Sequence, residues 1–272
     1  MIEIFAGILV LLLSGLFIIL GIGGSSILIP IFYSIGISMD QARLAGLATL
    51  FVSTGTALVI YLRSSLFKKS DLQEIALILF GMLIAIPFGV WLGNTLDDNI
   101  LIGLFSLSLF ASAFAMAFEK KIVKSERKKG LTFAQEGEIG ILAGLEVSIF
   151  RIALIRGAVG GGAGLATGML GIGSGIFIMP SLILTGTEPK RAAILSVACM
   201  FVASLFSIVN QLAYYAPSDY SLMLICAFAA LIGSYVGATL LATGRVKGEF
   251  IKKAFPLVLV ALAIKLAFDF FA

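Results

Sequence analysis

Long apolar runs separated by short polar segments recur along the whole chain. The runs are about 20 residues long, which is the length an α-helix needs to cross about 30 Å of hydrocarbon. This pattern predicts an all-α polytopic membrane protein. We expect eight full spans, at residues 4–20, 42–62, 75–96, 100–118, 152–170, 192–212, 222–243 and 254–271.

Two shorter apolar stretches interrupt this series. Residues 26–35 and 176–184 are too short to cross a membrane as helices, and each follows a cluster of glycines. We interpret both as half-helices or re-entrant segments. Pro30 and Pro180 either start these short helices or kink them, and in both cases they reinforce the break.

The two halves of the chain repeat each other at an offset of 150 residues. Gly21-Ile22-Gly23-Gly24 aligns with Gly171-Ile172-Gly173-Ser174, and further matches continue into the next long helix. Each half then holds one long helix, a break, a short segment and three long helices. If the short segment returns across the membrane, the halves have opposite orientation. We therefore expect two inverted-topology repeats, residues 1–118 and 139–272, joined by a linker at 119–138.

The basic residues favour this opposite orientation, because Lys and Arg collect in cytoplasmic loops. They are concentrated at residues 63–69, in the linker 119–138 and at residues 245–253, whereas Asp97-Asp98-Asn99 and Ser218-Asp219-Tyr220 carry none. We expect a cytoplasmic linker, both termini extracytoplasmic, and a prokaryotic plasma (inner) membrane. The N-terminus lacks the basic region of a secretory signal and is expected to stay as the first helix. An interfacial helix is expected at residues 139–149.

Composition narrows the classes of function. The chain is 60% hydrophobic and only 12% charged, which excludes a water-soluble fold. It has no histidine, and Cys199 and Cys226 lie in apolar runs without metal-ligand spacing. We therefore expect no metal, no cofactor and no enzyme activity, and no nucleic-acid partner, because the net charge of +4 sits in short loops.

The paired glycine breaks are the candidate site. A broken helix exposes backbone N–H and C=O groups at membrane depth, which only protein or a water-filled cavity can satisfy. Matching breaks in two repeats point to the midplane binding site of a secondary transporter, where a helix N-terminus attracts an anion. The alternative for any single glycine is close helix packing. The candidate binding residues at the breaks are Gly21, Gly23, Gly24, Ser25, Ser26, Gly171, Gly173, Ser174 and Gly175.

Polar residues of the following long helices complete the predicted site. Arg43 and Arg191 each lie near the start of such a helix, and we expect them to contact an anion. The hydroxyls of Thr49 and Ser196 bond either a ligand oxygen or their own helix backbone.

Other polar residues near the span ends have simpler interpretations. Asn210 and Gln211 align with Ile60 and Tyr61, and we expect interhelical hydrogen bonds there. Arg151, Arg156 and Lys265 are expected to extend to the lipid headgroups. No carboxylate in the middle of a span is a strong candidate for carrying a proton.

Several motifs together resemble the TauE/SafE family of sulfite and organosulfonate exporters. They are the Gly21–Gly24 break, Pro30, Tyr61, Asp71 and Gly89-x-x-x-Gly93, and in the second half Gly168-x-x-Gly171-x-Gly173-x-Gly175, Pro180 and Gly233-x-x-x-Gly237. The resemblance spans nearly the entire chain. It implies a membrane permease for small sulfur-containing anions such as sulfite, sulfoacetate or taurine-derived sulfonates. Gly24-Ser25-Ser26 and Ser174 replace parts of the family's usual triple-glycine runs, which leaves the substrate open.

The leading hypothesis is a secondary transporter that exports such an anion by alternating access between the two repeats. A sulfonate is a weakly hydrated anion with delocalised charge, so neutral donors and helix ends can hold it. One alternative is a membrane thiol-disulfide electron carrier that uses Cys199 and Cys226, although such chemistry needs accessible thiols. An anion channel is another. The expected partners are a small anion and the lipid bilayer, and a homodimer is left open.

Overall fold

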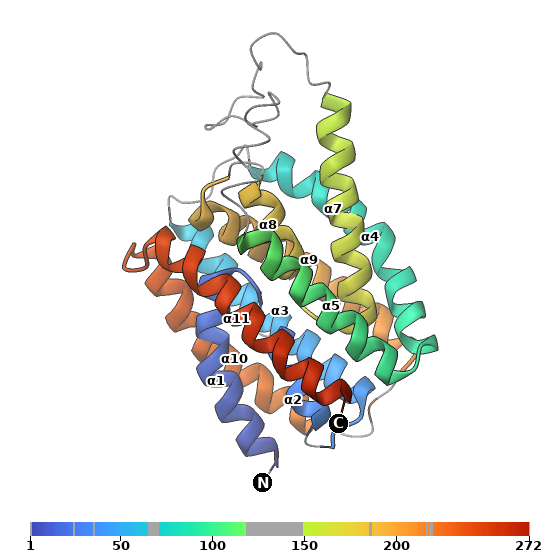
Figure 1. Ribbon diagram of the computed structural model, residues 1–272. Helices are drawn as coiled ribbons and strands as arrows, with labels where there is room; N and C mark the ends of the chain where they lie inside the picture. Colours follow the sequence, from blue (N-terminus) through green and yellow to red (C-terminus); the bar gives the residue numbers. More distant parts are fainter. Residues whose placement is uncertain are drawn as a thin grey trace.

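The computed structural model describes residues 2–23, 25–34, 36–64, 71–117, 149–184, 187–215, 217 and 220–271. Within these ranges every regular element is a helix (Figure 1). The helices are α1 (Ile2–Leu20), α2 (Ser25–Ser34), α3 (Met39–Arg63), α4 (Asp71–Thr95), α5 (Asp98–Ala117), α7 (Ile149–Leu170), α8 (Gly175–Leu184), α9 (Pro189–Leu212), α10 (Ser221–Ala242) and α11 (Gly248–Phe271).

The helices lie where the hydrophobic pattern predicts them, within six residues at either end. The two short apolar stretches form the ten-residue helices α2 and α8. The predicted linker at residues 119–138 lies outside the described residues. So does the predicted interfacial helix, except for Ile149, which is the first residue of α7.

The surface of the described helices is rich in large apolar side chains. Helices α3, α4, α9 and α10 are long and apolar enough to cross a membrane. A soluble protein does not expose so many large hydrophobic groups, and here they suit contact with lipid. The chain is therefore an all-α, multi-pass membrane protein. The most exposed of these side chains include Leu12, Phe80, Phe88, Trp91, Leu107, Phe228 and Leu257.

The repeat found in the sequence also governs where the helices begin. Helices α2, α3, α4 and α5 start at residues 25, 39, 71 and 98, and α8, α9, α10 and α11 start 150 residues later, at 175, 189, 221 and 248. We call two positions that are 150 residues apart equivalent. Each half thus has the same order of long and short helices, with one ten-residue helix after a break.

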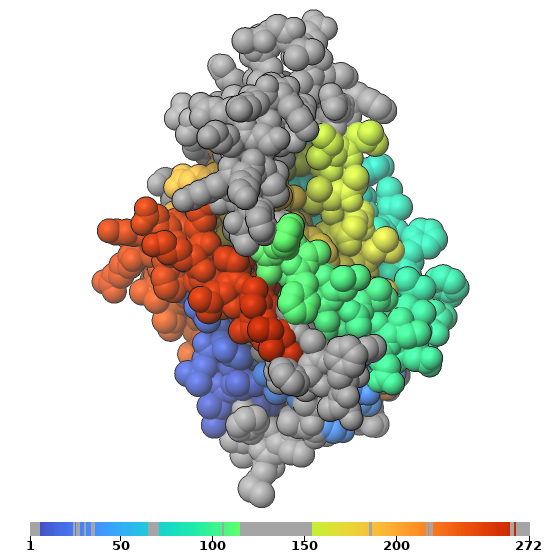
Figure 2. Space-filling view, in the orientation of Figure 1, coloured from blue at the N-terminus to red at the C-terminus, as the bar shows by residue number. Residues whose placement is uncertain are grey.

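The halves exchange helices when they pack. Helix α10 packs against α1 and α3, and α4 packs against α7 and α9, so each three-helix bundle contains one helix from the other half (Figure 1). We call these the α1 bundle and the α7 bundle. Helices α3 and α9 join the two bundles. Helices α5 and α11 lie side by side over one face of the molecule (Figure 2).

Contacts with helix α4 show in which direction the equivalent helices α3 and α9 run. Its 25 residues make it about 37 Å long. Arg191, in the first turn of α9, forms an ion pair with Asp71 at the start of α4. Arg43, near the start of α3, donates to Asn94 Oδ1 at 3.5 Å, in the last turn of α4. Helices α3 and α9 therefore begin at opposite ends of α4.

Glycines allow the helices of each bundle to approach backbone to backbone. A Cβ built at Gly164 of α7 would lie 2.6 Å from the carbonyl oxygen of Met82 in α4. In the α1 bundle, a Cβ built at Gly15 would lie 2.8 Å from the carbonyl oxygen of Gly233 in α10. Small residues at such contacts are typical of membrane helices. Gly15 and Gly164, which lie outside the breaks, therefore serve close helix packing.

Candidate functional site

The two glycine breaks lie against each other in the interior. Gly21 and Gly171 have φ values of 65° and 70°, which end α1 and α7 because other residues rarely adopt this conformation. A Cβ built at Gly23 would lie 3.7 Å from the Cα of Gly173, and one built at Gly175 would lie 2.8 Å from the carbonyl oxygen of Ile22. The predicted residues of both breaks are thus brought together. Gly24 lies outside the described residues.

Both short helices begin at this meeting point. Helix α2 starts at Ser25 and α8 starts at Gly175, directly after the breaks. The carbonyl oxygen of Ser174 accepts hydrogen bonds from the backbone N–H groups of Phe177 and Ile178, each at 3.0 Å, so Ser174 occupies the capping position of α8. The first N–H groups of a helix lack partners within it and carry a positive partial charge. Two such helix ends meet here, which favours an anion.

Three buried hydroxyls, two at the breaks and one on α3, have no hydrogen-bond partner within the described part of the chain. They are those of Ser25, Thr49 and Ser174, and each residue is completely buried. An unpaired buried hydroxyl costs about 1–3 kcal/mol, so such groups are rare without a ligand or water. For Thr49, the predicted alternative of a bond to its own helix is not what the structure has. Ser26 lies in α2, and its side chain is outside the described part.

Ser196 connects α9 to the first break. Its hydroxyl donates to the carbonyl oxygen of Gly21 at 2.9 Å. This bond links the α7 bundle to the end of α1, and it is neither of the two alternatives expected from the sequence. The equivalent position in the first half is Gly46, where a built Cβ would lie 3.4 Å from the Cβ of Ser25.

Two apolar residues that the sequence did not single out close the centre of the site. A Cβ built at Gly173 would lie 3.2 Å from Leu50 Cδ1 and 3.1 Å from Met200 Sδ. Leu50 and Met200 are equivalent, and the neighbouring equivalent residues Phe51 and Phe201 stack with ring centroids 5.0 Å apart. The alignment of Phe51 with Phe201 at the 150-residue offset was the one sequence signal that could have pointed to Leu50 and Met200. With Leu50 and Met200 fully buried, the centre is closed to solvent.

Arg43 lies against the second break, as its predicted role requires. Only 3% of its surface is exposed. It donates to the carbonyl oxygen of Met169 at 3.2 Å and forms an ion pair with Asp40, while its Nε has no partner in the described part. A Cβ built at Gly171 would lie 3.1 Å from the Cβ of Arg43. Arg43 therefore links α3 of one bundle to α7 of the other.

Arg191 is placed differently from Arg43. Its guanidinium pairs with Asp71 of α4, which is 1% exposed. The residue equivalent to Arg43 is Ala193, whose Cα would lie 2.7 Å from a Cβ built at Gly21. The structure therefore joins one of the two predicted arginines to a break and joins the other to a carboxylate.

The interpretation of Arg156 as a headgroup-directed residue is wrong. Its side chain is buried, at 5% exposure, and it donates to Glu74 at 2.8 Å. Because Glu74 lies one turn after Asp71, two carboxylates of α4 bind arginines of α7 and α9. These ion pairs hold the α7 bundle together. The side chains of Arg151 and Lys265 lie outside the described part.

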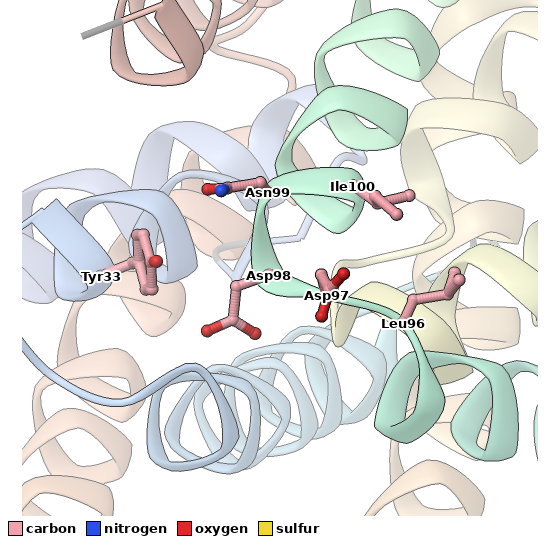
Figure 3. Close-up of a pocket in the computed structure, with 6 residues that line it drawn as sticks. All are labelled: Tyr33, Leu96, Asp97, Asp98, Asn99 and Ile100. Atoms are coloured by element: carbon pink, nitrogen blue, oxygen red, sulfur yellow. The ribbon is translucent and has the colours of Figure 1, made fainter.

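A cavity of about 540 Å³ opens where α2 ends and α4 turns into α5 (Figure 3). Figure 3 shows Tyr33 across the cavity from the Asp98 and Asn99 turn. Burial raises the pKa of Asp98, with smaller contributions from nearby charges. This acidic lining opposes anion binding. The cavity is therefore not the candidate anion site. It is lined by Tyr33, Leu96, Asp97, Asp98, Asn99 and Ile100.

The cysteines do not form a redox pair in this structure. Neither Cys199 nor Cys226 forms a disulfide bond, and both are completely buried. A thiol that exchanges electrons needs access and a stabilised thiolate. Their burial therefore weakens the electron-carrier alternative.

The apolar helices, with two broken helices meeting inside, define a helical membrane protein of the transporter kind. The family model described as Sulfite exporter TauE/SafE matches residues 4–266. Since this match covers nearly all 272 residues, the chain belongs to the TauE/SafE family. The family is one of membrane exporters of sulfite and organosulfonates, and its members are transporters rather than enzymes. Comparisons with curated proteins and with solved structures find no match.

Proposed function

We propose that the protein exports a small sulfur oxyanion, sulfite or an organosulfonate such as sulfoacetate, through a site between the two breaks. One observation carries this proposal. The N-terminal ends of α2 and α8 meet at a point where the hydroxyls of Ser25 and Ser174 are buried without partners, and Thr49 of α3, which packs against α2, carries a third such hydroxyl. Such a place offers several hydrogen-bond donors in a dry environment.

The available donors suit a sulfite or sulfonate group. Its charge is spread over three oxygens, so several neutral donors can share it. The three hydroxyls and the free N–H groups of two helix ends supply such donors without a full countercharge. Arg43 adds a positive charge beside the second break, and its pairing with Asp40 moderates that charge. Binding of moderate strength permits release, which a transporter requires.

The bundle arrangement supports a mechanism of alternating access. In this mechanism, the α1 bundle and the α7 bundle rock about the contact of α3 with α9, and the breaks open to one side at a time. The opposite directions of α3 and α9 along α4 support two inverted repeats with eight spans and two re-entrant half-helices. The basic loop after Arg63 supports extracytoplasmic termini in a prokaryotic plasma membrane.

The proposed substrate and site are tested by thermal unfolding of the purified protein in detergent. The ligands are sulfite, sulfoacetate, taurine, sulfate, thiosulfate, acetate and chloride. A ligand that binds only the folded state stabilises it by about 2.7 kcal/mol at a concentration of 100 Kd. We expect a rise in Tm with sulfite or sulfonates and none with acetate or chloride. The same rise for every anion, or no rise for any, would overturn the proposal.

Two serine variants locate the site in this experiment. Ser174→Val replaces an unpartnered hydroxyl at the break with a larger apolar group, and we expect it to abolish the ligand-dependent rise in Tm. Ser106→Ala is the matched control, because this buried hydroxyl of α5 bonds the carbonyl oxygen of Ile102 at 3.0 Å. A Ser174→Val protein that responds to the ligand like the wild type would place the site elsewhere.

A further inference from the structure

One face of α3 and the same face of α9 extend from the breaks toward opposite ends of the molecule. Leu50 and Met200 lie on these faces and touch both breaks. Tyr61 and Gln211 follow eleven residues later on the same faces, which is about three turns or about 16 Å of helix. Because α3 and α9 begin at opposite ends of α4, Tyr61 and Gln211 lie toward opposite ends too.

The residues between the breaks and these two positions are small and completely buried. Three of them, Ser53, Thr54 and Ser204, bond the backbone of their own helix. The residues on these stretches are Ser53, Thr54 and Ala57 on α3, and Ala203, Ser204 and Ser207 on α9.

The far ends of both faces carry buried polar atoms without partners. Within the described residues, the hydroxyls of Tyr61 and Ser207 and both amide atoms of Gln211 make no hydrogen bond. All three residues have no exposed surface. The interhelical bonds predicted here are absent from the described part, since Asn210 instead donates to Phe206 of its own helix at 2.8 Å. Such atoms are rarely left unpaired unless a ligand or water visits them.

We propose that Tyr61 at one end, and Gln211 with Ser207 at the other, form outer subsites on the path of the oxyanion. This inference rests on the proposed function. Each subsite offers neutral O–H or N–H donors. An anion that leaves the central donors is received by these groups before it reaches water, and because the donors are neutral they release it again. The basic loop after Arg63 assigns the Tyr61 subsite to the cytoplasmic side and the Gln211 subsite to the outside.

Two conservative variants test the outer subsites. Tyr61→Phe removes one hydroxyl, and Gln211→Met replaces the amide with an apolar chain of similar length. The matched controls are Tyr235→Phe and Gln73→Met, because both side chains are exposed. The measurements are uptake of radiolabelled sulfite into right-side-out and inside-out membrane vesicles, and Tm in detergent. Vesicles from cells that lack the protein give the blank.

We expect Tyr61→Phe to reduce sulfite uptake about tenfold in inside-out vesicles and Gln211→Met to do so in right-side-out vesicles, by raising the apparent KM on that side. The Tm of each variant stays level or rises, because an unpaired buried polar group has been removed. The controls match the wild type. A purely structural role would lower Tm and would not distinguish the two sides.

The outcomes separate this inference from the proposed function. If the wild type transports sulfite and both variants match it on both sides, the outer subsites are refuted and the central site stands. A variant whose Tm falls while its KM stays unchanged also refutes them. If the wild type transports no sulfur oxyanion, the proposed function fails, and the outer subsites fail with it.

Discussion

The two glycine breaks follow the same chain path but differ in what packs against them. Ala193 of α9 packs against Gly21 of the first break, whereas the equivalent residue of α3, which packs against Gly171 of the second break, is Arg43. Arg43 also bonds the end of α7, so it ties the two bundles together at that end. The repeated backbone therefore places the two breaks together, and the side chains that differ between the halves set the charge and the contacts of the candidate site.

The same contrast holds where α2 and α8 begin. The first residue is Ser25 in the first half and Gly175 in the second. A side chain fits at residue 25, but a Cβ at residue 175 would lie 2.8 Å from the carbonyl oxygen of Ile22 and closer still to that of Gly21. The start of α8 is therefore more crowded than the start of α2.

Exchanging these two residues is expected to give the largest effect. Gly175→Ser forces the breaks apart, and we expect it to lower the free energy of unfolding by about 1–3 kcal/mol and to abolish sulfite transport. Ser25→Gly, the reverse change, leaves the packing intact but removes one of the proposed donor hydroxyls, so we expect it to weaken transport while Tm stays near that of the wild type. The measurements are Tm in detergent and sulfite uptake in proteoliposomes. Equal behaviour of the two variants would mean that the breaks are not packed as described.

Arg43 makes a contact between the two bundles, and Arg156 makes a contact within one bundle, so the two arginines can be compared. Both are buried arginines, but Arg43 joins α3 to α7, whereas Arg156 joins α7 to α4 inside the α7 bundle. We expect Arg43→Met and Arg156→Met each to lower the free energy of unfolding by about 1.5–3 kcal/mol, since each loses hydrogen bonds of a charged group. Only Arg43→Met should change the rate of sulfite transport. If Arg156→Met slows transport as much, the α7 bundle does not move as a unit.

Most of the fold could be predicted from the sequence because membrane helices have a strong and simple signal. The apolar runs gave each helix within a few residues, and the 150-residue offset gave the two breaks. The exchange of α4 and α10 between the halves was not predictable, since it depends on which small residues meet. Gly164 and Gly233 contact helices far away in sequence, and no local pattern names those partners.

The candidate site was predictable only in its backbone. Glycine clusters mark the breaks, and they were found together. The positions of the side chains were harder to predict, because apolar, polar and charged residues all occur near the ends of membrane spans. Arg156 has the position of a headgroup-directed residue, yet Glu74 holds it inside the protein. Leu50 and Met200 have the composition of ordinary core residues, and only their contact with both breaks reveals their position at the centre.

The acidic cavity beside Arg43 gives a smaller, pH-dependent effect. Asp98 lies before the apolar part of α5, and its pKa in the folded protein is raised, mainly by burial. The folded state therefore holds this proton more tightly than the unfolded chain, whose aspartates have a pKa of about 3.9. The stability that protonation contributes is present below that value and is lost as the pH rises through the folded pKa.

Asp98→Asn removes this dependence without removing the side chain. We expect the variant to be slightly more stable than the wild type at pH 7, with the difference shrinking toward pH 4. Tm scans across this range make the measurement. Glu249→Gln is the matched control, because its carboxylate is exposed at the same end of the equivalent helix α11. If the stability difference between Asp98→Asn and the wild type grows toward pH 4, the pKa of Asp98 is not raised in the folded protein.

The smallest effect is expected at the cysteines, where the two halves differ again. Cys199 is equivalent to Thr49, whose buried hydroxyl makes no hydrogen bond within the described residues, whereas Cys199 carries a buried thiol. Because the buried thiols take no part in the proposed transport, replacing Cys199 and Cys226 together with alanine should leave sulfite uptake at the wild-type rate. Thr49→Ala, in contrast, should weaken the ligand-dependent rise in Tm. If uptake is lost both when the two cysteines are replaced with alanine and when they are replaced with serine, thiol chemistry is needed for transport. The functional residue of this equivalent pair would then be Cys199 and not Thr49.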